Sequence, residues 1–199
     1  MIEVEIRGRL DKGAATKLRS FFGKKGTLVE KQSREMILLF DNPGYADDPG
    51  KREVDIRLRN TNGTCEIMVK RKAHEHNAGR SEVSLKLSDK NLENAKEIVK
   101  AFGCSRGLWM HRTKNVYRHN GIEWSIVEAV PHPSIKNSAA KRIFYFEAER
   151  AARDGADIEK IRMALVAEAE RLGLSVFTPE QYYDFVGELG REVNKRVTW

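Results

Sequence analysis

The chain has 199 residues, of which 40% are hydrophobic and 33% are charged, so it is long and apolar enough to bury the core of one domain. Its charged fraction exceeds the roughly 25% typical of soluble domains, which indicates an unusually polar folded protein rather than a disordered tail. No apolar run approaches the ~18 residues of a membrane span, and no signal-peptide pattern follows Met1, so we expect a cytoplasmic protein without membrane contact. Cys65 and Cys104 lack the spacing of a disulfide framework or a zinc site.

The formal net charge of +7 is unevenly distributed along the chain. Residues 151–199 contain 7 Lys and Arg against 9 Asp and Glu, so the basic excess lies wholly within residues 1–150. A basic excess of this kind favours a polyanionic partner for the first three quarters of the chain.

Strict alternation of apolar and charged residues predicts several strands with two unlike faces. The run Ile2-Glu3-Val4-Glu5-Ile6-Arg7 is the clearest, and similar patterns follow at residues 54–59, 67–72 and 80–87. Weaker strand patterns occupy residues 36–41, 112–118, 122–130 and 143–149. Turn signals separate these runs, and the Asn62-Gly63 pair between two of them predicts a hairpin. About eight strands result.

Four helices are expected between and after the strands. Asp11 is placed to cap a helix ending near Phe22, and Ser88 to cap a second helix that ends at Gly103. Residues 157–172 predict a third helix, and Thr178-Pro179-Glu180-Gln181 is a capping sequence for a fourth. Because strands and helices are mixed and no linker separates them, we expect one α+β domain over residues 1–199.

The charged strand faces allow two arrangements. In an ordinary antiparallel sheet they point to water and the apolar faces form the core. In a closed barrel they point inward, the helices cover the apolar outer faces, and the charged lumen requires a ligand or ion to compensate it.

Seven strand motifs in order resemble the CYTH, or triphosphate tunnel metalloenzyme, family. Glu3-x-Glu5-x-Arg7 resembles the family's opening ExExK signature, and Glu147-x-Glu149 resembles its closing ExE. Between them stand the segment ending at Asp41, then Arg57-x-Arg59, Lys70-x-Lys72, Arg80-x-Glu82, Arg112-x-Lys114 with Tyr117, and Glu128. The helix containing Tyr182 resembles the family's C-terminal tail. The resemblance implies an eight-stranded antiparallel closed β-barrel with helices packed outside, and Mg²⁺- or Mn²⁺-dependent chemistry on triphosphates.

Two positions depart from the family pattern. Arg7 stands where the family has lysine, and a permanently charged guanidinium can bind phosphate but does not readily give up a proton. Glu128 stands where the family has aspartate, which lengthens that carboxylate by one methylene.

The charges inside such a barrel suit a triphosphate and a divalent cation. The predicted phosphate-binding residues are cationic and make charge-assisted hydrogen bonds: Arg57, Arg59, Lys70, Lys72, Arg80, Arg112 and Lys114. Carboxylates need a cation between themselves and phosphate, and hard Mg²⁺ or Mn²⁺ matches oxygen ligands, so we assign the metal to Glu3, Glu5, Glu147 and Glu149. Glu82, Glu128 and Arg7 complete the predicted catalytic set.

Three functions remain open from the sequence. The first is a metal-dependent triphosphatase acting on inorganic triphosphate or on a nucleoside or thiamine triphosphate. The second is a class IV adenylyl cyclase that converts ATP to cyclic AMP and pyrophosphate. The third is a non-catalytic binder of polyphosphate or nucleic acid, although interleaved glutamates disfavour phosphate-backbone binding. Among partners we expect a small-molecule triphosphate and no nucleic acid other than a 5′-triphosphate RNA end, and we leave a homodimer open.

Overall fold

The computed structural model describes residues 2–47, 51–72, 79–88, 90–136, 141–153 and 157–199. In chain order its elements are β1 (Ile2–Leu10), α1 (Lys12–Lys25), β2 (Thr27–Leu39), β3 (Val54–Thr61), β4 (Thr64–Lys72), β5 (Gly79–Lys86), α2 (Glu93–Ala101), β6 (Arg106–His119), β7 (Ile122–Val130), β8 (Ile143–Ala152), α3 (Ile158–Arg171), α4 (Pro179–Glu192) and β9 (Lys195–Thr198).

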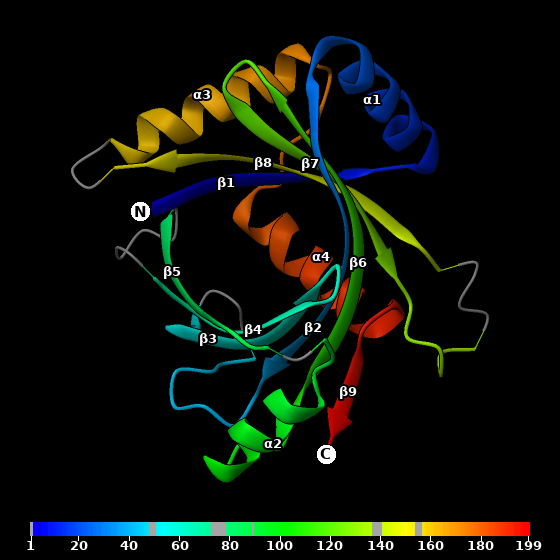
Figure 1. Cartoon of the computed structure of the whole chain (residues 1–199). Helices are drawn as coiled ribbons and strands as arrows, with labels where there is room; N and C mark the ends of the chain where they lie inside the picture. Colours follow the sequence, from blue (N-terminus) through cyan, green and yellow to red (C-terminus); the bar gives the residue numbers. More distant parts are fainter. Residues whose placement is uncertain (1, 48–50, 73–78, 89, 137–140, 154–156) are drawn as a thin grey trace.

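Eight of the strands form a closed antiparallel barrel (Figure 1). Hydrogen-bonded neighbours follow in the order β2, β3, β4, β5, β1, β8, β7 and β6, and β6 pairs back with β2. Among the described residues, β1 aligns nine residue pairs with β8 and three with β5. The short β9 pairs with the start of β6 outside this ring. The expected eight-stranded closed barrel in an α+β fold is therefore confirmed.

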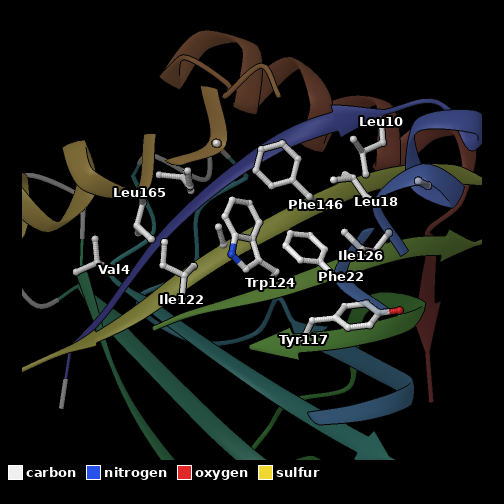
Figure 2. Packing of buried hydrophobic residues seen from close by; sticks show 14 of the residues in the cluster. Val4, Leu10, Leu18, Phe22, Tyr117, Ile122, Trp124, Ile126, Phe146 and Leu165 are labelled. Carbon is white, nitrogen blue, oxygen red and sulfur yellow. The ribbon is translucent and has the colours of Figure 1, made fainter. Parts of the chain in front are cut away.

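The main apolar core lies on the outer face of the barrel wall. Even-numbered residues of β7 point outward, and Trp124 is fully buried between the sheet and the helices. Phe22 from α1 stacks on Trp124 with 5.3 Å between ring centroids, and Leu165 from α3 belongs to the same cluster (Figure 2). A second outer cluster packs α2 over β3 and β4. Because the apolar faces are covered from outside, the charged faces are left to the lumen.

Helix α4 lies across one end of the ring, within the outline of the barrel in Figure 1. Its Phe185 and Leu189 pack on Tyr145 and Val127, which project from the inner faces of β8 and β7. A complete capping box at Thr178 and Gln181 fixes where this helix begins, as the sequence predicts. Helix α4 consequently covers one end of the barrel.

Several element boundaries differ from those expected. Strand β2 begins at Thr27 rather than near residue 36, because twelve of its residues find partners on β6. Ser88 does not cap α2, which begins at Glu93 without a side-chain cap. The residues before it are held to the barrel instead, where the Lys90 carbonyl accepts a hydrogen bond from Asn60.

Both cysteines are buried and unbridged, in agreement with the sequence analysis. Among the helices of the described ranges, none combines the length and the apolar character needed to cross a bilayer.

Candidate active site

The barrel encloses a cavity of about 330 Å³, and 14 of the 27 residues that line it are charged. Every second residue of a strand faces this cavity. On β1 these residues are Glu3, Glu5 and Arg7, while Val4 and Ile6 are buried in the outer core. The other charged side chains that line it are Arg34, Arg52, Arg57, Arg59, Lys70, Glu82, Arg112, Lys114, Glu123, Glu147 and Glu149. The alternation that predicted the strands therefore places carboxylates and cations in one lumen.

Carboxylates gather where β1 and β8 meet. In the antiparallel register Glu5 lies directly opposite Glu149, and on the other side of β8 Glu123 of β7 is also opposite Glu149. Burial, and then the neighbouring Glu5 and Glu3, raise the pKa of Glu149 to about 8. A group of acids that repel one another in this way is poised to accept a cation.

Glu147 is held differently from Glu149. It is 6% exposed, Lys114 Nζ contacts one carboxylate oxygen, and Arg7 Nε donates to the other at 3.3 Å. Burial alone would raise the pKa of Glu147, but Lys114 and Arg7 lower it well below its usual range. Glu147 is therefore charged and already neutralised by two protein cations.

Arg7 joins β1 to the helix that covers the barrel end. Its guanidinium donates to Glu5 at 2.7 Å and to the Tyr182 hydroxyl at 2.7 Å, and lies 5.2 Å from the Tyr182 ring centroid. Burial disfavours its charge, but Glu5, Tyr182 and Glu147 raise the pKa of Arg7 overall. Arg7 consequently stays protonated, as expected of a guanidinium, which does not readily give up a proton.

A cationic wall faces the acids from β2, β3 and β4. Lys70 Nζ lies 3.0 Å from Glu3 and 2.9 Å from Glu82, and Arg59 pairs with Glu66 and Glu82 at 2.6 and 3.1 Å. Burial would raise the pKa of Glu82, but Lys70 and Arg59 lower it overall, so this carboxylate is a weak base. Arg57 forms an ion pair with the buried Asp55 at 2.6 Å.

Arg34 stands out in the cationic wall because the described residues offer it no ion-pair partner. Its guanidinium donates to Thr61 Oγ1 at 3.2 Å and to Gln32 Oε1 at 2.8 Å, both uncharged. Burial and the nearby Arg59 lower the pKa of Arg34. An anion in the lumen would supply the counter-charge that this side chain lacks.

The other predicted phosphate-binding residues have varied positions. Arg112 reaches the lumen but is only 5% exposed, and it donates to the His111 carbonyl and to Asn194 Oδ1, which ties the segment after α4 to the barrel. Lys72 and Arg80 lie opposite each other on β4 and β5, and their side chains are outside the described part of the structure. For these two residues the assignment stays a prediction.

Glu128 does not face the lumen, and the prediction that places it in the site is wrong. It shares the outward parity of Trp124 on β7, and its carboxylate contacts Arg142 and lies 4.0 Å from Arg19. These residues line a separate groove of about 950 Å³ on the outer wall, beside the start of α1. The inward acid of β7 is Glu123, five residues earlier and on the opposite face.

Sequence reasoning missed Arg34 and Glu123. Arg34 precedes the strand expected at residue 36, so it was assigned to no element. Glu123 could have been found from β7 itself, because the bulky Trp124 next to it marks the covered face and leaves Glu123 facing inward.

The donor set fits a hard divalent cation by its chemistry. Glu3, Glu5 and Glu149 offer carboxylate oxygens from two adjacent strands, and burial together with the nearby Glu5 and Glu3 raises the pKa of Glu149. Within the described ranges, no three acidic, histidine or cysteine side chains converge on a common coordination point. Glu5 and Glu3 turn instead toward Arg7 and Lys70.

Solved structures with the same fold come from several organisms. The PH1819 protein of Pyrococcus horikoshii has a TM-score of 0.70 and 17% identity, over 94% of this chain and 98% of that chain. A candidate adenylate cyclase from Vibrio parahaemolyticus has a TM-score of 0.61 and 15% identity, over 94% of this chain and 98% of that chain. HpAC1 from Hippeastrum has a TM-score of 0.56 and 13% identity, over 93% of this chain and 95% of that chain. It is described as a candidate adenylyl cyclase with a dominant triphosphatase activity. Neither the family models nor the curated proteins contained a match. The resemblance to the triphosphate tunnel family is thus supported at the level of the fold.

Proposed function

We propose that this chain is a triphosphate tunnel enzyme, a metal-dependent triphosphatase that releases the terminal phosphate of inorganic triphosphate or of an organic triphosphate. The observation that carries the proposal is one barrel cavity with cations on β2, β3, β4 and β6 and facing carboxylates on β1 and β8. Cations alone would suit any anion. The opposing acids are explained best by a substrate that brings a divalent cation with its phosphates.

The cations of the lumen would bind and orient the phosphate groups. Arg34 has no acidic partner to give up, and Lys70 and Arg59 already point into the same space. Their guanidinium and ammonium groups make charge-assisted hydrogen bonds to phosphate oxygens and stabilise the negative charge that develops on them during transfer. We assign Glu82 to holding Lys70 and Arg59 in place.

Glu3, Glu5 and Glu149 are the residues that would hold Mg²⁺ or Mn²⁺. When bound, the ion would polarise a phosphoryl oxygen and lower the pKa of a coordinated water. Glu147, which the sequence analysis grouped with these ligands, is assigned here to fixing Arg7 and Lys114 instead. The covered end leaves the reacting phosphate surrounded by protein groups, which reduces competition from bulk water.

A phosphate-release screen tests the proposal. The purified chain would be incubated with tripolyphosphate, ATP, GTP, thiamine triphosphate and 5′-triphosphate RNA, each with Mg²⁺, Mn²⁺ or a chelator. We expect orthophosphate from at least one substrate, and only in the presence of metal. Cyclic AMP with pyrophosphate from ATP would identify a cyclase, and tight binding without products would identify a binder; either outcome would overturn the proposal.

Replacing Arg34 should separate substrate binding from folding. Because its pKa is lowered by burial and by Arg59, its charge is disfavoured in the free protein, so Arg34→Gln should leave the melting temperature unchanged or slightly higher. Loss of one charged hydrogen-bond donor, about 1.5–3 kcal/mol, should raise KM roughly tenfold to a hundredfold. Initial rates and a thermal melt of the same sample would measure both.

Arg59→Ala is the informative comparison for Arg34→Gln. Loss of the Arg59 guanidinium would leave Glu66 and Glu82 without this partner, so Arg59→Ala should lower the free energy of unfolding as well as the affinity for substrate. An Arg34→Gln variant with wild-type KM would remove Arg34 from the binding set.

A further inference from the structure

Helix α1 differs from the other helices in its charge. Within Lys12–Lys25 it carries five cations and no acid: Lys12, Lys17, Arg19, Lys24 and Lys25. In the described structure, Lys12, Lys17, Lys24 and Lys25 form no ion pair, and the nearest carboxylate to Arg19 is Glu128 at 4.0 Å. By contrast, both Arg162 and Arg171 of α3 pair with glutamates three residues before them.

The helix dipole favours only part of this charge distribution: Lys24 and Lys25 lie in the last turn of α1, where cations are stabilising, but Lys12 lies in the first turn. The first turns of α2, α3 and α4 each contain an acid, whereas the first residue of α1 is a lysine. Positive charge near a helix N-terminus is unfavourable by a few tenths of a kcal/mol to about 1 kcal/mol. The cations of α1 outside its last turn are therefore not explained by the helix dipole.

The solvent-facing side of α1 could accommodate a closely bound chain. Gly13, Thr16, Ser20 and Gly23 share one exposed face, so only small side chains stand between Lys12 and Arg19 on one side and Lys17 and Lys24 on the other. The opposite side is fixed in the core, where Ala15, Leu18 and Phe22 are buried. The exposed side of α1 is thus basic and free of bulky side chains, and its buried side anchors the helix to the core.

The C-terminal end of α1 lies at the end of the barrel opposite α4. The Lys25 carbonyl lies 3.0 Å from Nδ1 of His119, the last residue of β6. The neighbouring Arg118 lies 3.8 Å from Glu123, which lines the lumen. An α-helix rises 1.5 Å per residue, so the fourteen residues of α1 extend this basic surface for about 21 Å along the outer wall (Figure 1).

The surface lacks the features of a single-stranded nucleic acid site. Such sites combine cations with aromatic side chains on which bases stack. The aromatic residues of α1 are unsuited to this: Phe22 is fully buried against Trp124, and Phe21 is half-buried with its ring edge-on to Phe22 and His119. A polymer with charge on every unit and no bases matches the surface better.

We propose that the basic face of α1, defined by Lys12, Lys17, Arg19, Lys24 and Lys25, binds long-chain inorganic polyphosphate. The chain lies along α1 and its end enters the tunnel mouth near Arg118. Binding to α1 stands independently of the chemistry in the lumen, whereas the position of the chain end rests on the proposed triphosphatase function.

The test compares two variants with the same change in net charge. One is Lys17→Gln/Lys24→Gln/Lys25→Gln on α1, and the matched control is Lys90→Gln/Lys100→Gln/Lys160→Gln at exposed positions elsewhere. Binding of polyphosphate of about a hundred units is measured with a chelator present, over a range of salt concentrations. We expect the α1 variant to lose at least about tenfold in affinity and about 2 in the slope of log K against log salt, and the control to change little.

Two further measurements identify the occupant and separate this inference from the proposed function. With metal present, the α1 variant should keep wild-type turnover of tripolyphosphate and lose about tenfold in kcat/KM for the long chain. Absence of any turnover would refute the proposed triphosphatase function. The binding measurements alone would then test whether α1 binds polyphosphate. Equal losses in both triple variants, or tighter α1-dependent binding of a single-stranded RNA of equal charge, would overturn the polyphosphate proposal.

Discussion

Glu5→Gln and Glu149→Gln should each lower turnover by at least tenfold to a hundredfold, equivalent to about 1.4–2.7 kcal/mol in the barrier. The two side chains face each other across β1 and β8, and each substitution keeps the size of the side chain while removing a charge that would hold the cation. Calorimetric titration with Mn²⁺ should show weaker binding in both variants. Glu170→Gln, an exposed change of the same type on α3, should behave as wild type.

Glu149→Gln should also affect stability with a definite dependence on pH. The folded protein holds the Glu149 proton up to about pH 8, whereas the unfolded chain releases it near the ordinary value of 4.5. The charge of Glu149 thus reduces the free energy of unfolding increasingly as the pH rises between these values. In chelator, the variant should match wild type at pH 4 and melt at a higher temperature at pH 8. Full activity of both glutamine variants in chelator would refute the metal assignment.

Lys114→Met should produce the largest loss of stability among single substitutions in the lumen, about 3 kcal/mol. It leaves the buried Glu147 with Arg7 as its remaining contact, and breaking a buried ion pair from one side costs about 3–5 kcal/mol. Urea unfolding would measure the change. Lys141→Met, which removes an exposed pair with Glu192, is the matched control and should cost no more than about 1 kcal/mol.

The double variant Lys114→Met/Glu147→Gln tests the origin of that loss. Removing the second charge abolishes the uncompensated carboxylate, so most of the lost stability should return. If the double variant is as unstable as the single one, packing of the lysine side chain rather than charge would account for the effect.

The alternating pattern predicted the clearest strands well, and the resemblance to the tunnel family implied that they close into a barrel. Glu3, Glu5, Glu147 and Glu149 lie two residues apart in pairs, so each pair shares one face regardless of the rest of the fold. Alternation alone cannot decide whether that face is inside or outside. In the structure the decision comes from the helices, since α1 and α3 cover the apolar face and leave the charged one to the lumen.

The residues that sequence reasoning misplaced depend on pairing over long distances. The part of β2 from Glu30 to Glu35, which contains Arg34, is polar on both faces and becomes a strand only by pairing with its neighbours, chiefly β6. Glu128 was assigned from a motif resemblance, although its parity relative to Trp124 places it outside. The four residues of β9 likewise owe their extended conformation to β6.

The pairing of β1 with β8 has a consequence for the order of events during folding. Arg7 and Glu147 are 140 residues apart in the chain, and the facing glutamates of the two strands are separated by a similar length. Contacts so distant in sequence form slowly, because closing the loop between them costs conformational entropy before the contacts stabilise the chain. During synthesis the first strand emerges well before β8, so its Glu3 and Glu5 have no facing residues on β8 until most of the chain is made. The carboxylate cluster is therefore assembled among the last parts of the molecule, when the barrel closes.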